Sequence, residues 1–168
     1  MIVVIAGVAG SGKTTVGEQL ASQLGWAFAD GDSFHPAANV AKMRAGIPLT
    51  DADRKPWLAA ITAWMDDIIA SGQSAVLACS ALKRSYREEL LGGRDQAVMV
   101  FLEVSREQDE SRVAHRKGHF FAEPLLASQF AALELPHPAE PRVFPVTTAD
   151  QSPGQLVAEI IARLGLRR

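Results

Sequence analysis

The sequence contains little cysteine, no long apolar run and little net charge. Its single cysteine, Cys79, excludes a disulfide within the chain and a cysteine-based zinc cluster. No run of about 18 uncharged apolar residues is present that could cross a bilayer. The formal net charge of −2 gives no general attraction to nucleic acid or to acidic membranes. We therefore expect a cytoplasmic protein that binds small molecules rather than nucleic acid or a membrane.

The chain does contain enough apolar sequence for one domain, residues 1–168. Of its 168 residues, 48% are hydrophobic, which argues against a disordered chain. Short β-branched runs alternate with helical patterns, which is typical of a parallel sheet covered by helices on both faces. The last of these strands contains Pro145 and is expected at an edge of the sheet. Strands are predicted at 2–6, 26–29, 75–79, 97–102 and 143–146, and helices at about 14–24, 37–45, 51–70, 84–91, 123–134 and 153–164, with a further polar helix ending near 116.

The most specific motif follows the first predicted strand. Residues 7–14 read G-V-A-G-S-G-K-T and fit the phosphate-binding pattern G-x-x-x-x-G-K-[ST]. In this loop backbone N–H groups converge on phosphate oxygens, Lys13 reaches the β and γ phosphates, and the Thr14 hydroxyl binds Mg²⁺. An ordinary glycine-rich turn would not need a lysine at the crowded start of a helix. We therefore expect a three-layer α/β P-loop NTPase fold that binds a nucleoside triphosphate through Gly7, Val8, Ala9, Gly10, Ser11, Gly12, Lys13, Thr14 and Thr15.

A pair of carboxylates follows the second predicted strand, at Asp30 and Asp32. In a parallel sheet this turn lies on the same edge as the phosphate loop. Asp30 or Asp32 could hold Mg²⁺ through water or orient an attacking hydroxyl, and phosphoryl transfer needs little other chemistry from a protein. A solvated turn uses the same residues, so both interpretations remain open.

Basic residues follow the third predicted strand. Lys83 and Arg87 are four residues apart, so a helix would place them on one face with Arg84 beside them. Such a group next to a phosphate loop suits a carboxylate or phosphate of a second substrate, and the alternative is a solvated helix face. Cys79 ends an apolar run, and we expect it to be buried rather than nucleophilic.

A second basic segment follows the fourth predicted strand. Its cations are Arg106, Arg112, Arg116 and Lys117. A mobile flap that brings arginine to the transferring phosphoryl group, and that excludes water, would have this composition. The alternative is pairing with acidic neighbours at i,i+4. His35 and His119 could either bind substrate or cap turns.

Five blocks of the sequence, in this order, together resemble the bacterial gluconate kinases. They are residues 7–14, 31–39, 42–58, 79–87 and 119–130. The first block is shared by a large superfamily, whereas G-D-x-x-H-P, P-L-x-D-x-D-R-x-P-W and C-S-A-L-K-R are specific. The similarity extends from residue 1 to about 135 and weakens after that.

The resemblance implies a fold akin to shikimate and nucleoside monophosphate kinases, usually as a homodimer. It implies a helical substrate-binding part at about 35–72 and a lid at about 112–126. The implied reaction transfers the γ-phosphate of ATP, with Mg²⁺, to the 6-hydroxyl of D-gluconate.

The resemblance also implies roles for individual residues. Asp32 would be the acceptor-side base or orienting carboxylate, and Asp30 would lie nearer the metal. Pro56-Trp57 would shape the acceptor wall, unless Trp57 is simply core. The implied catalytic residues are Lys13, Asp32 and Arg116. The residues that would face gluconate are His35, Arg54, Lys83, Arg84 and Arg87, and those that would face the phosphates are Arg112 and Arg116.

Two alternatives stay open. The first is a P-loop kinase for another small hydroxy acid such as shikimate, because basic side chains bind a carboxylate whatever the length of the carbon chain that carries it. The second is a regulatory module that hydrolyses or only senses ATP, which would not need the acceptor-side residues Asp32 and Lys83.

Overall fold

The structure is a computed structural model that describes residues 1–104, 123–149 and 151–167. At its centre lies a sheet with the strand order β2-β3-β1-β4-β5, in which every neighbouring pair is parallel. The strands are β1 (Ile2–Ala6), β2 (Ala27–Asp30), β3 (Ala75–Ala78), β4 (Ala97–Glu103) and β5 (Val143–Thr147). The predicted five-stranded parallel sheet is confirmed, and β5, which carries Pro145, is at an edge as expected.

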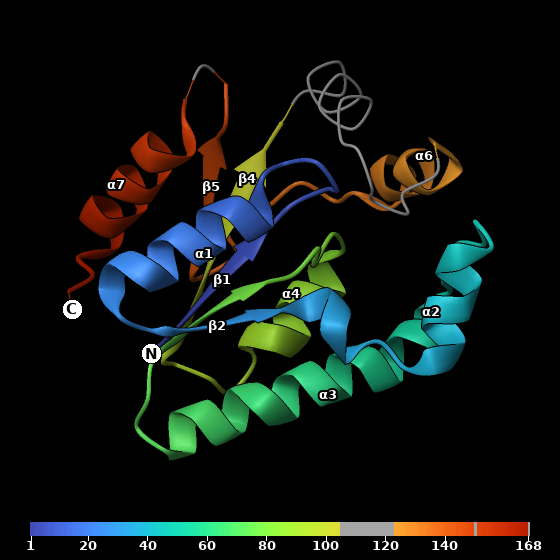
Figure 1. Ribbon diagram of the computed structural model, residues 1–168, viewed down its shortest axis with the longest axis horizontal. Coiled ribbons are helices and arrows are strands. Elements are labelled where there is room, and N and C mark those ends of the chain that lie inside the picture. Colours follow the sequence, from blue (N-terminus) through green and yellow to red (C-terminus); the bar gives the residue numbers. More distant parts are fainter. Residues whose placement is uncertain (105–122, 150, 168) are drawn as a thin grey trace.

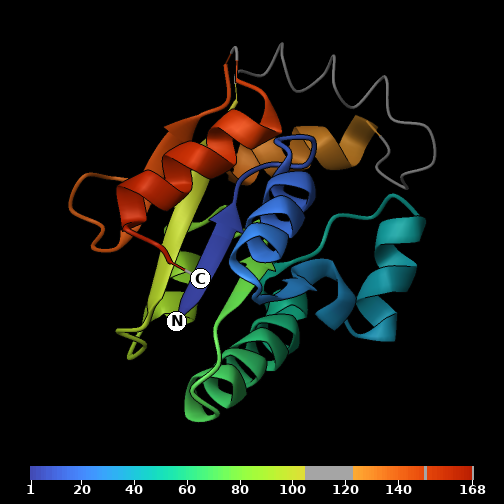
Figure 2. The same ribbon diagram turned by 60° about the vertical axis from the view of Figure 1, so that its left-hand side comes forward.

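Two pairs of helices cover the sheet (Figures 1 and 2). On one face α1 (Lys13–Leu24) and α7 (Pro153–Leu164) pack against Val3 and Ile5 of β1. On the other face α3 (Asp51–Ala70) and α4 (Arg84–Leu91) pack against Ile2, Val4 and Ala6. Because side chains alternate along a strand, a strand covered on both faces must be apolar throughout, as β1 is. The three-layer α/β architecture is confirmed.

The remaining described helices lie at one end of the molecule. Figure 1 shows α2 (Ala37–Arg44) and α6 (Glu123–Ala132) at this end. A short 3₁₀ helix, η1 (Gly31–Phe34), connects β2 to α2, where the sequence predicted only a polar turn. The predicted polar helix near 116, residues 112–122 of the predicted lid and the side chains of 123–126 lie outside what the structure describes. None of the described helices has the length and apolar character needed to cross a membrane.

The register of the sheet brings three strand ends level with one another. Ala78 of β3 pairs with Ile5 of β1 on one side and with Asp30 of β2 on the other. Just beyond these pairs, the Gly7 N–H donates to the Ser80 carbonyl at 3.2 Å. The phosphate loop, the carboxylate turn and the loop after β3 therefore begin side by side.

Candidate active site

The phosphate loop has the backbone geometry that its glycines predict. Gly7, Gly10 and Gly12 have φ angles of 138°, 85° and 96°, a region that favours glycine. At Gly7 a Cβ atom would lie 2.7 Å from the Leu102 carbonyl oxygen, so only glycine fits there. Lys13 begins α1, and its Nζ donates to the carbonyl of Val8 at 2.8 Å. The loop thus curls over the N-terminus of α1, where backbone N–H groups attract anions.

A hollow that we call the phosphate hollow opens beside this loop. Its lining residues are Ala9, Gly10, Lys13, Thr14, Asp30, Asp32, Ala78, Cys79, Ser80 and Gln129. Within it, Thr14 Oγ1 donates to Asp30 Oδ2 at 3.3 Å, so the two predicted metal ligands lie together. A hydroxyl and a carboxylate are the oxygen donors that Mg²⁺ prefers, so this pair fits the ion. Asp30 Oδ1 also accepts the backbone N–H of Asp32 at 3.0 Å, which fixes the carboxylate turn.

Gly31 explains why the two carboxylates are separated by glycine. A Cβ atom at Gly31 would lie 2.7 Å from the Ala78 carbonyl oxygen. The Gly31 carbonyl, in turn, accepts a buried hydrogen bond from Trp57 Nε1 at 2.7 Å. The turn is therefore pressed against β3 on one side and held by α3 on the other.

A second hollow, which we call the acceptor hollow, adjoins the first. It is lined by Asp32, His35, Met43, Pro48, Leu49, Arg54, Trp57, Ser80, Ser128 and Gln129. Three residues, Asp32, Ser80 and Gln129, line both hollows. The Asp32 residue consequently lies at the junction of the two. Trp57, which is 1% exposed, belongs to the core and also lines this hollow.

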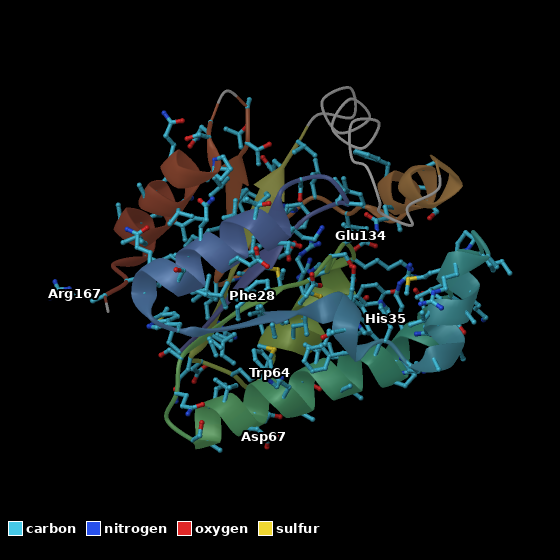
Figure 3. All side chains as sticks on the ribbon, viewed as in Figure 1. Phe28, His35, Trp64, Asp67, Glu134 and Arg167 are labelled. Carbon is cyan, nitrogen blue, oxygen red and sulfur yellow. The ribbon has the colours of Figure 1, made fainter. Side chains whose placement is uncertain are left out.

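His35 is a neutral hydrogen-bonding group in the acceptor hollow. Its ring stacks on Trp57 with centroids 4.6 Å apart, and Figure 3 shows it beside α2. Burial, followed by the positive charge of Arg54, lowers the pKa of His35 from 6.5 to about 4. Asn39 Nδ2, which can only donate, lies 3.3 Å from His35 Nδ1. The ring proton is therefore on Nε2.

This depressed pKa predicts how stability changes with pH. Between pH 6.5 and about 4 the unfolded chain binds a proton at His35 that the folded chain does not bind. The associated stability is therefore complete above pH 6.5 and is lost as the pH falls towards 4. Thermal unfolding at pH 7.5 and pH 5 should show a larger loss of Tm in the wild type than in His35→Asn. Equal losses in the two proteins would contradict the assignment.

Of the predicted cations, Arg54 lies in the acceptor hollow and Lys83 lies beside it. Arg54 Nη1 donates to the Leu49 carbonyl at 2.6 Å, and its guanidinium lies 5.8 Å from the centroid of the Tyr86 ring. Lys83 Nζ lies 5.7 Å from the same ring centroid and donates to the Asp51 carboxylate at 2.7 and 2.9 Å. The Asp51 hydrogen bond raises the pKa of Lys83. Lys83 is therefore a charged residue at the margin of the hollow.

The expectation that Arg84 and Arg87 face the second substrate is corrected by the structure. Arg87 is 1% exposed, and its Nε and Nη2 bind the Glu140 carboxylate at 2.7 and 2.8 Å. Arg84 is exposed and pairs with Glu88 at 2.7 Å. Both line a separate hollow between α4 and β5. Lys83 is the extended N-cap of α4 and not a helical residue, so the spacing of four residues does not place it on one helix face with Arg87.

Cys79 is a buried thiol. Burial, with the negative charge of Asp32 next, raises its pKa to about 12. This agrees with the expectation from its apolar context. The predicted phosphate-binding residues Arg112 and Arg116, together with His119, lie outside the described residues.

Two residues of both hollows were missed by the sequence interpretation. Ser80 follows β3, and the next residue, Ala81, has a φ of 41°, an uncommon conformation for a non-glycine residue. Gln129 comes from α6, and its Oε1 accepts the Ala9 N–H at 2.7 Å across 120 positions of sequence. Ser80 had a local signal, because it follows the end of a predicted strand. Gln129 had no such signal, because only the fold brings α6 to the phosphate loop.

The phosphate hollow and the acceptor hollow share a carboxylate. This arrangement is typical of a P-loop kinase that acts on a small molecule. In agreement, the family model for shikimate kinase matches residues 9–165. Within this class the chain belongs to the gluconokinase family. It is 46% identical over 158 residues to the gluconokinase of Gluconobacter oxydans strain 621H, a match that covers 94% of this chain and 88% of that protein.

Solved structures agree with this assignment. A gluconokinase from Sinorhizobium meliloti 1021 has a TM-score of 0.84 and 44% identity, over 97% of this chain and 90% of its own. An unliganded sugar kinase from Janibacter sp. HTCC2649 has a TM-score of 0.90 and 41% identity, over 98% of this chain and 94% of its own. The resemblance inferred from the sequence blocks is confirmed.

Proposed function

We propose that this protein is an ATP-dependent gluconokinase that transfers the γ-phosphate of ATP to the 6-hydroxyl of D-gluconate. The observation that carries the proposal is the position of Asp32, which lines both the phosphate hollow and the acceptor hollow. A carboxylate at such a junction can orient the hydroxyl of one substrate towards the phosphate of the other. Membership in the gluconokinase family supports gluconate as that acceptor.

On the nucleotide side the chain supplies positioning and charge. The phosphate loop and Lys13 would hold the β and γ phosphates, and Thr14 with Asp30 would hold Mg²⁺, Asp30 through water. When bound, Mg²⁺ neutralises charge that develops on the phosphate oxygens. Family resemblance assigns Arg112 and Arg116 to the same phosphates, as part of a lid at about 112–126.

On the acceptor side Asp32 would take the proton of the 6-hydroxyl as that oxygen attacks. Arg54 would attract the carboxylate of gluconate, and the neutral His35 would donate from Nε2 to a hydroxyl. The apolar wall formed by Trp57 would exclude water and so limit wasteful hydrolysis of ATP. Of these residues, His35, Arg54 and Trp57 belong to the substrate-binding part proposed at 35–72. We also propose a homodimer, which light scattering can check.

A coupled assay of ADP release tests the function. With ATP and Mg²⁺, D-gluconate should give the highest kcat/KM in a panel that also contains other sugar acids, shikimate and nucleoside monophosphates. Efficient turnover of shikimate or a nucleotide without turnover of gluconate would overturn the proposal. Release of ADP at one rate with every acceptor and with none would indicate the regulatory alternative.

A further inference from the structure

Gln129 connects the phosphate loop to the acceptor hollow, although no step of the proposed function uses it. Its Oε1 accepts the Ala9 N–H at 2.7 Å, and its side chain lines both hollows. The Ala9 N–H belongs to the crest of the phosphate loop, directly before Gly10. A side chain held there moves with the loop that would carry the phosphates.

The partner of Gln129 also fixes the orientation of its amide. A backbone N–H can only donate, so the oxygen of the amide must face Ala9 and the nitrogen must point away from it. Among the described residues, Nε2 of Gln129 has no hydrogen-bond partner. It also does not belong to the buried side-chain atoms that lack a partner, so it is accessible. The amide nitrogen is therefore not occluded, and Gln129 lines both hollows together with Asp32.

The helix that carries Gln129 is anchored at its C-terminal end. Beyond α6, Glu134 N donates to the Leu82 carbonyl at 3.0 Å, and Glu134 Oε2 accepts the Arg84 N–H at 2.7 Å. The Glu134 carbonyl accepts from buried Arg87 at 2.8 Å. Figure 3 shows Glu134 between α6 and α4. The phosphate loop therefore holds the amide of Gln129, and the loop after β3 holds the segment that follows its helix.

We propose that Gln129 is an acceptor-binding residue whose Nε2 donates a hydrogen bond to the reacting hydroxyl. This inference rests on the proposed function. A hydroxyl oxygen has one proton and two lone pairs. If Asp32 accepts the proton and one lone pair attacks phosphorus, the second lone pair can accept from Gln129. The two side chains together then fix the direction of the attacking lone pair, which neither could do alone.

Two substitutions separate this role from simple support of the phosphate loop. Gln129→Glu keeps an oxygen for the Ala9 N–H but removes the donors, whereas Gln129→Met removes both functions at similar size. Gln129→Glu should lower kcat/KM for gluconate by about 10- to 100-fold, with KM for ATP changed by less than about twofold. Gln129→Met should lower kcat/KM for gluconate by a similar factor and should also raise KM for ATP.

The control is Gln23→Glu, which adds the same charge on the exposed face of α1 and should leave both substrates unaffected. The inference is overturned if Gln129→Glu retains the gluconate parameters of the wild type, or if only KM for ATP rises. If the wild type fails on gluconate but phosphorylates another acceptor of the panel, the proposed function fails and the same comparison on that acceptor tests Gln129. If the wild type phosphorylates no acceptor, the proposed function and the proposed role of Gln129 are both refuted.

Discussion

Replacement of Asp32 by asparagine lowers kcat for gluconate phosphorylation by at least about 100-fold, with the Kd of ATP little changed. Asparagine has nearly the same shape but cannot accept the hydroxyl proton. The expected metal ligands keep their contact, because Thr14 Oγ1 donates to Asp30. The measurement pairs steady-state kinetics with calorimetric titration of ATP in the presence of Mg²⁺.

Asp67→Asn is the matched control for this substitution. Asp67 is exposed on α3, and Figure 3 shows it well apart from His35. The control should retain wild-type kcat. Near-normal turnover in Asp32→Asn would refute the role of this carboxylate, and a loss of ATP binding would move Asp32 to the nucleotide side.

The second large effect is on stability and concerns Arg87. Arg87→Met leaves the carboxylate of Glu140, a residue that is 7% exposed, without the cation that pairs with it. It also removes the donor to the carbonyls of Leu82 and Glu134. Breaking a buried ion pair costs about 3–5 kcal/mol, so Tm should fall by roughly 10 °C in a chain of this size. Calorimetry or urea unfolding measures the change.

Arg84→Met provides the comparison, because it breaks an exposed pair on the same helix. Exposed pairs contribute about 0–1 kcal/mol, so its Tm should stay near that of the wild type. The double variant Arg87→Met with Glu140→Met should recover part of the lost stability, since no charge then remains buried. Similar losses in the two single variants would show that the Arg87–Glu140 pair has no special structural role.

The parts of the site that were predictable from sequence depend on local chemistry. The glycines and Lys13 of the phosphate loop specify both a backbone shape and a ligand. The Asp30-Gly31-Asp32 turn lies beside the phosphate loop because the parallel register aligns the ends of β1, β2 and β3. The helix ends could also be predicted from local signals, as at Thr50, where a capping box begins α3.

The parts that were not predictable depend on contacts between distant segments. Arg87 was expected at a substrate, but its partner Glu140 lies 53 residues further along the chain, in a region without a recognisable motif. Gln129 likewise reaches Ala9 only after the sheet and α6 are in place. Periodicity places residues on a face of their own helix, but it does not say which distant group meets that face.

Phosphorus NMR of the reaction product tests the central claim most directly. The protein is incubated with ATP, Mg²⁺ and D-gluconate, and the spectrum is recorded with proton coupling retained. We predict a phosphomonoester signal that grows in step with ADP and is split into a triplet by the two protons of the gluconate C6 carbon. A signal of inorganic phosphate alone, or an ester split into a doublet by a single proton, would contradict the transfer of phosphate to the 6-hydroxyl.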